Sequence, residues 1–329
     1  MSAEVESIFY YGESPWHKQG KEVLHALTAE EAIIEAGLNW EVDMAPLYHR
    51  WQGNRVKIEH KVGTRRLTDG RILGIVSPEY QPVQNRMAFG FFDSVVGTGE
   101  AKYHTAGSLR NGQKIWMLAK VGDSPLSIKG DAVDKYLLLM NGHDGTHALK
   151  MFFTPVRVVC MNTLMAAEAS ARRVETFYAK HFGNVTGRME QAREILGMTT
   201  RFFENFQEQA MLLAERQLPA PEFPKLLAVA FGTTGAIRPE DVINLEDIGS
   251  TRKVNELVKI ERLFDGEGKG LNEPGIRGTK WAAYNAVAEY CDYGRQYRGR
   301  VPEDNRLEDV WLGTIQRIKN RAWNYLIKT

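Results

Sequence analysis

Hydrophobic residues in the region 47–76 lie among polar residues in a pattern typical of β-strands. Turn signals at 52–54 and 68–70 divide this region into shorter runs. Asp69-Gly70 between strand-like flanks is typical of a hairpin. The pattern therefore predicts consecutive strands joined by tight turns.

A second set of strand-like runs occupies residues 103–159. Asn111-Gly112 is the strongest hairpin turn in the chain, and the polar, glycine-rich residues 141–145 provide another. These turns predict an antiparallel meander of about four strands with loops of ordinary length. The residues expected in its core are Trp116, Tyr136, Leu138 and Phe152.

Helical spacing appears between and after these strands. Thr28 and Glu31 have the three-residue separation of a capping box, which predicts the start of a helix. Gly97 suits the end of a later helix. In the first half, helices are expected at 28–36, 85–96 and 162–171, whereas residues 1–27 are expected to be irregular.

The second half of the chain is dominated by helical patterns, predicted at 186–218, 224–231, 239–248, 250–264, 279–293 and 303–327. Strands followed by helices favour an α+β fold, an antiparallel β-meander with packed helices followed by a mainly helical C-terminal half. We expect a mixed β-rich core domain over 1–175 and a helical region over 176–329 packed on it.

The composition is that of a soluble globular protein. The 329 residues are 43% hydrophobic and 25% charged, and their net charge is +1, so nucleic-acid binding would need local segregation of charge. Cys160 and Cys291 lie far apart without metal spacing, and we expect buried, reduced thiols. The acidic N-terminus lacks the apolar core of a signal peptide, and no apolar run approaches about 18 residues. A cytoplasmic protein without a membrane span is expected.

Two segments have the residue types of catalytic motifs without their context. Lys269 lies among glycines, but its loop follows a helix and lacks the Ser or Thr of a phosphate loop, so we expect a flexible surface loop. His143 and Asp144, with His147 nearby, suggest a metal-dependent phosphohydrolase pair. A hairpin turn explains the same residue types, since turns favour Asn, Gly and Asp. No cofactor is expected.

Basic residues gather in the segment 49–71, where seven lysines and arginines against two acids give a charge of +5. Trp51 lies among them. A basic ribbon with interleaved rings is typical of proteins that hold single-stranded nucleic acid, because the charge holds phosphates and the rings stack on bases. The alternative is a solvated, charged edge strand that resists aggregation. The cations of the segment are Arg50, Arg55, Lys57, Lys61, Arg65, Arg66 and Arg71.

Two smaller basic clusters lie elsewhere. Arg110 and Lys114 flank the Asn111-Gly112 turn, and alternation places Lys114 on the same face as Trp116. Arg295 and Arg298 lie among tyrosines near the end of a predicted helix, where cations are favoured for reasons unrelated to nucleic acid.

Several strings resemble a known family. They lie at 14–17, 37–42, 80–85, 105–109, 154–163 and 278–290. Together they resemble the phage/plasmid-like proteins with the domain of unknown function numbered 932, from about residue 8 to residue 325. Lys18-Gln19 departs from the family pattern. The resemblance implies a mobile-element protein from a phage, prophage or plasmid, and it supplies no activity and no catalytic residues.

The first hypothesis is a single-stranded DNA-binding protein, a strand-annealing recombination protein without catalytic chemistry that forms homo-oligomers in the host cytoplasm. Annealing releases free energy, so no metal or nucleotide is needed. The resemblance to annealing proteins is one of fold alone. The expected contacts are Arg50, Trp51, Arg55, Lys57, Lys61, Arg65, Arg66, Arg110, Lys114, Arg295 and Arg298.

Two alternatives remain open. A protein-interaction or anti-defence factor would use a partner face on the C-terminal helices and on the helix that carries Phe202, Phe203 and Phe206. A metal-dependent nucleic-acid enzyme would use the histidines and aspartate of the segment 143–147.

Overall fold

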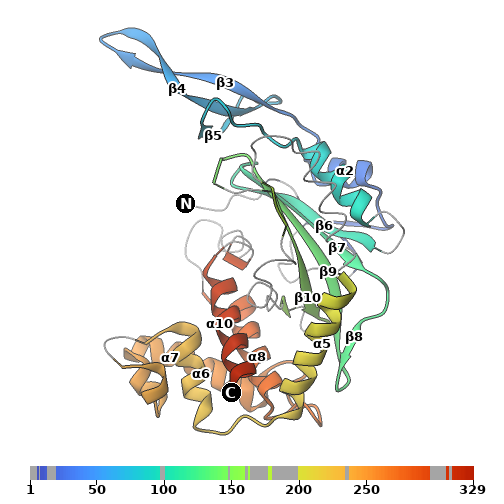
Figure 1. Cartoon of the computed structure of the whole chain (residues 1–329), viewed down its shortest axis with the longest axis vertical. Coiled ribbons are helices and arrows are strands. Elements are labelled where there is room, and N and C mark those ends of the chain that lie inside the picture. The colour runs from blue at the N-terminus through green and yellow to red at the C-terminus, as the bar shows by residue number, and fades with distance from the viewer. Residues whose placement is uncertain are drawn as a thin grey trace.

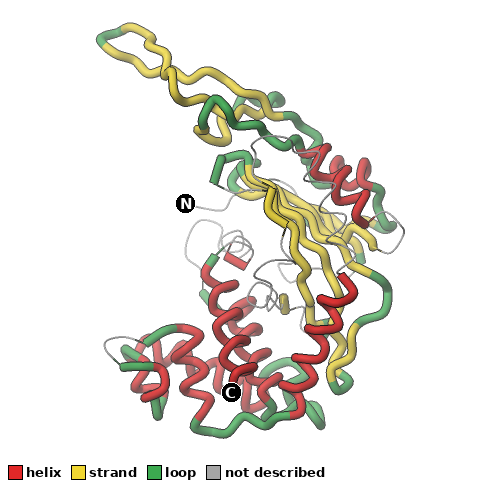
Figure 2. Tube along the Cα trace, viewed as in Figure 1, coloured by secondary structure: helices red, strands yellow, loops and turns green. Residues whose placement is uncertain are grey.

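A computed structural model describes residues 6, 8–12, 20–96, 101–146, 149–159, 162–163, 177–179, 199–233, 237–296, 309–310 and 313–329. These residues form an α+β fold with a large sheet, a smaller sheet that projects from it, and helices that gather around the C terminus (Figure 1). Figure 2 separates the strand-rich part from the mainly helical second half. The predicted fold class is confirmed.

The larger sheet, within the described residues, has nine strands in the order β11-β10-β9-β7-β6-β1-β2, with β12 beside β10 and β8 beside β9. Its central neighbours β10, β9, β7 and β6 are antiparallel, which confirms the predicted four-stranded meander. The strands are β1 (Ile8–Tyr11), β2 (Lys21–Val23), β6 (Ala101–Leu109), β7 (Lys114–Val121), β8 (Leu126–Ile128), β9 (Asp131–Gly142), β10 (Leu149–Arg157), β11 (Asn162–Thr163) and β12 (Phe177–Ala179).

Two predictions at the edges of this sheet are wrong. Residues 8–11 and 21–23 are strands rather than irregular chain, because β1 pairs with β6 almost a hundred residues later. Asn162 and Thr163 pair with β10 rather than start a helix, and residues 164–171 lie outside the described residues. A strand made by a distant partner leaves little trace in its own short sequence.

Both faces of the larger sheet are buried. Trp116, Tyr136 and Leu138 face a core shared with the C-terminal helices, as predicted, whereas the side chain of Phe152 lies outside the described residues. The opposite face packs against α1 (Ala29–Glu35) and α2 (Asn85–Val96). The capping box predicted from Thr28 and Glu31 is present at the start of α1. The sheet is therefore the middle layer of the fold.

The helical half follows the predicted pattern with shorter elements. The helix expected at 186–218 is described only from residue 199, and the segment 239–248 forms two short 3₁₀ turns. The elements are α5 (Thr199–Glu215), α6 (Glu222–Phe231), η1 (Pro239–Asp241), η2 (Leu245–Ile248), α7 (Thr251–Arg262), η3 (Leu263–Glu267), α8 (Lys280–Glu289), η4 (Tyr290–Gly294) and α10 (Thr314–Lys328). β12, on the C-terminal side of the predicted 175/176 boundary, pairs with β10 of the larger sheet.

The smaller sheet consists of β3 (Val42–Trp51), β4 (Asn54–Arg66) and β5 (Ile72–Val76), all antiparallel. The predicted turn between β3 and β4 is confirmed, and Gln52 and Gly53 have the positive φ angles of 47° and 81° that a two-residue hairpin requires. At the base, a Cβ on Gly74 would lie 2.5 Å from the backbone of Asp144, so only glycine allows β5 to approach the β9–β10 turn this closely.

A buried arginine joins the larger sheet to the helices. The Nε of Arg157 donates to Asp131 at 2.5 Å, and its two terminal nitrogens donate to the carbonyls of Lys269 and Gly270 at 2.6 and 3.1 Å. The indole of Trp281 donates to the same carboxylate at 2.8 Å. The glycine-rich loop expected to be free at the surface is thus packed against the end of β10.

Replacing Arg157 with Met should therefore destabilise the whole fold. The change leaves Asp131 buried without its counter-charge, which typically costs about 3–5 kcal/mol of the free energy of unfolding. Adding Asp131→Asn should recover part of the loss. Urea titration would measure both, with Arg252→Met in the exposed pair with Glu256 as a control that changes stability by less than about 1 kcal/mol. An Arg157→Met protein as stable as that control would contradict this role.

Candidate nucleic-acid interface and a buried pocket

The outer part of the β3–β4 hairpin, residues 47–61, stands away from the rest of the molecule, and we call it the distal arm (Figure 1). β5 pairs with β4 only between Val62 and Arg65, so the distal arm is a two-stranded ribbon without a third strand. Every residue from 48 to 61 except Ile58 is exposed. Its side chains are therefore available to a partner.

Cross-strand register sorts the charges of the distal arm onto one face. Tyr48 pairs with Lys57, and Arg50 pairs with Arg55. Paired residues and every second residue along a strand share a face. Glu59 and Lys61 lie farther along β4, where the register with β3 shifts between Lys57 and Val62. The face formed by Tyr48, Arg50, Arg55 and Lys57 has three cations and a charge of +3. We call it the basic face.

The cations of the distal arm are accessible to solvent. Arg55 lies 3.8 Å over the ring of Tyr48, and Lys57 lies 3.2 Å from Glu59 in an exposed ion pair. Exposed pairs of this kind contribute about 0–1 kcal/mol, so a phosphate can compete for the ammonium group. Among the described residues, Arg50 and Lys61 have no ion-pair partner. The arm therefore presents positive charge with little competition.

Trp51 is 63% exposed, but register places it on the opposite face of the ribbon from the cations. Val56 shares this second face, which we call the apolar face, and is also exposed. The ring on the basic face is instead Tyr48, which is 41% exposed. Trp51 lies at the tip of the hairpin, so a DNA strand could contact both the cations and the Trp51 ring only if it wrapped around that tip.

Arg65 and Arg66 lie at the base of the arm and are occupied by carboxylates. Arg65 donates twice to Asp43, at 3.0 and 2.5 Å, and these hydrogen bonds hold the pKa of Asp43 below its ordinary value. Arg66 is buried and donates to both Asp69 and Glu6, which raises its own pKa. We leave both arginines out of the proposed DNA contacts, because their charge is already neutralised.

The Arg110–Lys114 turn lies under the base of the arm rather than at a free surface. The predicted hairpin is present, with Asn111 and Gly112 at φ angles of 55° and 87°. A Cβ on Gly112 would meet Arg66 and Trp40 at 3.0 and 3.2 Å, so the turn packs against them. Lys114 is only 4% exposed. The lysine is therefore unavailable to a strand of DNA unless the arm moves away.

The cluster near residue 295 is described in part. Arg295 is half-buried and lies 3.4 Å from Asp309. Arg298 lies outside the described residues. The ion pair makes Arg295 less available to a phosphate, because a ligand would have to displace Asp309.

His143 belongs to the core beneath the arm. It is fully buried, and its Nε2 lies 2.8 Å from the side-chain oxygen of Asn85 at the start of α2. Asp144 accepts hydrogen bonds from Thr146, as a turn residue does. His147 lies outside the described residues. Within the residues that the structure describes, no three His, Cys, Asp or Glu side chains are grouped so as to hold a metal ion.

The aromatic residues assigned to a partner face are also buried. Phe202, Phe203 and Phe206 pack against the larger sheet and the C-terminal helices, which removes them from the surface. Cys291 is buried as expected, and burial raises the pKa of its thiol to about 12, which makes it unreactive. Cys160 lies outside the described residues.

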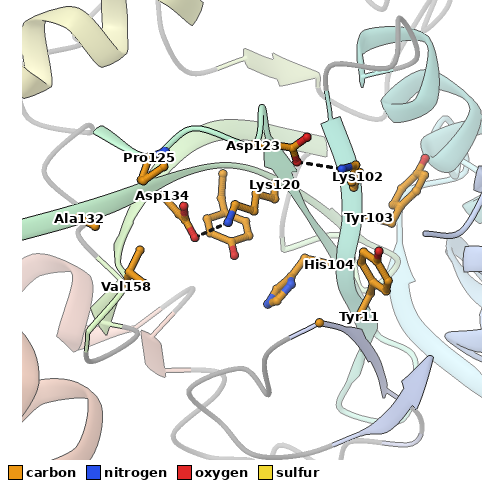
Figure 3. A pocket seen from close by; sticks show the side chains of 12 residues that line it. Tyr11, Lys102, Tyr103, His104, Lys120, Asp123, Pro125, Ala132, Asp134 and Val158 are labelled. Atoms are coloured by element: carbon orange, nitrogen blue, oxygen red, sulfur yellow. Dashed lines mark hydrogen bonds and ion pairs between the residues drawn. The ribbon is translucent and has the colours of Figure 1, made fainter. Parts of the chain in front are cut away.

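A polar pocket on the larger sheet has no counterpart among the sequence predictions. It has a volume of about 400 Å³ and opens beside β6, β7 and β9. Lys102 lies 2.8 Å from Asp123, and Lys120 lies 2.6 Å from Asp134, both within the lining (Figure 3). His104 completes this lining, and we call the cavity the His104 pocket.

A β-bulge turns His104 into the pocket. Tyr103 pairs with Ala119 and Thr105 pairs with Leu118, so His104 is the extra residue of β6. Bulges re-aim side chains and are frequent near functional sites. Figure 3 shows the imidazole pointing away from its own strand into the open space. Its ring lies 5.2 Å from that of Tyr136, edge to face.

The hydrogen bonds of His104 fix its tautomer. A hydrogen bond with the backbone of Tyr11 favours protonation of the ring, so the ring donates it to the carbonyl oxygen. Nε2 is buried and has no hydrogen-bond partner among the described residues, so the bond belongs to Nδ1. Burial lowers the pKa of His104 to about 4, against the smaller effect of the Tyr11 bond. At neutral pH, Nε2 is therefore a hydrogen-bond acceptor aimed into the pocket.

The family comparison gives a match without an activity. A family model described as "Domain of unknown function (DUF932)" matches residues 72–311, about three quarters of the chain. The match includes the larger sheet from β6 onward and the lining of the His104 pocket except Tyr11 and Gly12, whereas β3 and β4 of the arm precede it. No curated protein and no solved structure matches the chain. No described helix is long and apolar enough to cross a membrane.

The lowered pKa of His104 predicts a specific pH dependence of stability. The unfolded chain protonates this residue near pH 6.5 and the folded chain near pH 4, so the unfolded state binds more protons between these values. The free energy of unfolding should therefore fall by roughly 3 kcal/mol from this residue as the pH drops from 7 to 4.

Comparing urea unfolding of the wild type and of His104→Asn across this range would isolate the contribution of His104 to stability, because all other ionisable groups titrate in both proteins. The difference between the two proteins in the free energy of unfolding should be constant above pH 6.5, and it should shrink or reverse as the pH falls toward 4. Parallel curves throughout would show that His104 has no depressed pKa.

Proposed function

The chain belongs to the family of the domain of unknown function DUF932, and we propose that it binds single-stranded DNA through the basic face of its distal arm, without catalytic chemistry. The observation that carries this proposal is the segregation of charge along the arm. A protein with a net charge of +1 places four accessible cations and a single carboxylate on one projecting ribbon, and register gathers three of the cations on one face.

The geometry of the ribbon suits a flexible polyanion. Side chains on one face of a strand recur every second residue, about 7 Å apart, so Arg55 and Lys57 of β4 have a spacing that a phosphate backbone can follow, with Arg50 opposite Arg55. Tyr48 adds a ring on the same face, and its Arg55 partner can move to a phosphate at little cost because both are exposed. Binding by charge and stacking tolerates any base sequence.

The wider setting of the proposal is strand annealing by a homo-oligomer of a phage or plasmid protein in the host cytoplasm. Support for this setting comes from the resemblance of the sequence strings to phage/plasmid-like proteins and from the two-faced arm. One face of each arm would hold DNA while the other contacts a neighbouring copy. Annealing needs no fuel, which agrees with a site built from charge and rings alone.

The apolar face favours a second candidate function, protein binding. Trp51 and Val56 are large apolar side chains exposed together on the ribbon, and exposed aromatic residues are frequent centres of protein interfaces. In this alternative the cations only keep the arm soluble. Trp51→Ser would then abolish association with the partner while leaving the cations intact.

Neutralising the four cations of the distal arm, those of the basic face together with Lys61, should weaken binding to single-stranded DNA and reduce its dependence on salt. Each phosphate neutralised on a single strand contributes about −0.7 to the slope of log K against log[salt], so losing four contacts should reduce the magnitude of the slope by up to about 3. Fluorescence anisotropy with a labelled oligonucleotide at several salt concentrations measures this. The variant carries Arg50→Gln, Arg55→Gln, Lys57→Gln and Lys61→Gln.

A matched control removes four exposed cations from the helical half, with Arg252→Gln, Lys259→Gln, Arg321→Gln and Lys328→Gln. Both variants have the same net charge, so a non-specific effect of charge would appear in both. Equal affinities and equal slopes for the two variants would refute binding by the arm. Binding that depends on Trp51 but not on the cations would favour the protein-binding alternative.

A further inference from the structure

We propose that the His104 pocket binds a nucleotide, either free in solution or as one unstacked base of a single strand with its phosphate. The pocket lies on the larger sheet, away from the distal arm, and this inference goes beyond the function proposed for the arm. It rests on the size of the cavity, the acceptor at its centre, the rings beside it and the charges at its mouth.

The cavity has the dimensions of a small-molecule site. Its volume of about 400 Å³ falls within the range of about 300–1,000 Å³ typical of ligand pockets. Residues of β6, β7 and β9 supply most of its lining, so a rigid sheet shapes it. Sites on strands hold their groups more accurately than sites on loops.

The central acceptor selects the chemistry of the ligand. Nε2 of His104 is buried and lacks a partner within the described part of the chain, although buried polar atoms are normally paired. Because Nδ1 carries the proton, Nε2 needs a ligand that donates an N–H or O–H group. Nucleobases carry such donors on their pairing edges, and a base that enters the cavity would satisfy this nitrogen.

Rings beside His104 suit a planar ligand. Tyr136 packs edge to face with the imidazole at 5.2 Å, and both rings lie in the lining of the pocket, whereas the ring of Tyr11 packs with the core on the opposite face of the sheet. Proteins that bind unstacked bases place them against aromatic or apolar side chains, and His104 and Tyr136 offer such rings here. An aliphatic ligand with a single donor would leave these rings without a matching surface.

The charges at the mouth match a ligand with an attached anion. Lys102 and Lys120 are cross-strand partners in the β6–β7 pair, so their ammonium groups lie on the same face. Each is held by an aspartate, Asp123 or Asp134, and the four charges balance. A phosphate placed between the lysines would share their donors, and the aspartates would keep the empty pocket neutral.

Isothermal titration of the full-length protein with each of the four deoxynucleoside monophosphates tests the proposal, with ribose 5-phosphate as a probe that has no base. We expect at least one nucleotide to bind with one-to-one stoichiometry and ribose 5-phosphate not to bind. His104→Phe keeps an aromatic ring but removes the acceptor, and it should weaken binding about ten-fold. No binding of any nucleotide at millimolar concentration would overturn the proposal.

Lys102→Met provides a second variant that leaves the fold intact, because Lys102 and Asp123 are both exposed. It should weaken a nucleotide several-fold more than the corresponding nucleoside, whereas Lys328→Met should change neither. Nucleotide binding that is unchanged in both His104→Phe and Lys102→Met would place the ligand elsewhere and overturn the assignment.

The same titration on the protein with a neutralised basic face separates this inference from the function of the arm. Nucleotide binding should be unchanged there, whether or not the arm binds DNA. Competition with an unlabelled oligonucleotide then identifies the source of the ligand. Displacement of the nucleotide assigns the pocket to one base of a strand, and persistence of both ligands together assigns it to a free nucleotide.

Discussion

One buried guanidinium connects the two halves of this protein. Arg157 ends β10 and satisfies Asp131 on β9 together with two carbonyls of the loop between α7 and α8, while Trp281 of α8 adds a hydrogen bond to the same carboxylate. Burying charge costs several kcal/mol unless hydrogen bonds compensate, and here every nitrogen of the guanidinium has an acceptor. The larger sheet and the helices can therefore pack as one core.

The same logic divides the charges of the arm into two groups. At its base, Arg65 and Arg66 are matched with carboxylates, and Arg66 also lies 5.3 Å from the ring of Trp40. In the distal arm, the cations face solvent with a single carboxylate among them. Base cations stabilise the attachment of the arm, and distal cations remain available for a ligand. The position of a cation along the hairpin therefore decides whether it stabilises the arm or can bind a ligand.

Local signals in the sequence predicted much of the fold. The Asn111-Gly112 turn, the Thr28 capping box and the residues of α2 all depend on near neighbours, and each is confirmed. The strands β1 and β11 depend on partners elsewhere in the sheet, and they were not predicted.

The candidate sites depend even more on residues that are distant in the sequence, which local patterns cannot reveal. Arg50 and Arg66 are the same residue type in one basic segment, yet Glu6, sixty residues before Arg66, pairs with Arg66 and Arg71 and not with Arg50. Lys114 is buried, and the turn it follows packs against Arg66 and Trp40, which are distant in the sequence. A β-bulge turns His104 into its pocket, and no glycine or other turn residue near His104 in the sequence predicts this shift in register. A short Lys-Tyr-His-Thr string within a strand is the only local signal, and it is weak.

A shortened arm tests the central claim most directly. Pro46 and Val62 are cross-strand partners, so joining them through an Asn-Gly turn removes the distal arm without changing the register of the remaining sheet. We expect an unfolding midpoint close to that of the wild type, because the removed residues are exposed apart from the half-buried Leu47 and Ile58. We also expect a loss of single-stranded DNA binding of at least about 100-fold at low salt. Full affinity in a folded protein that lacks the distal arm would contradict the account.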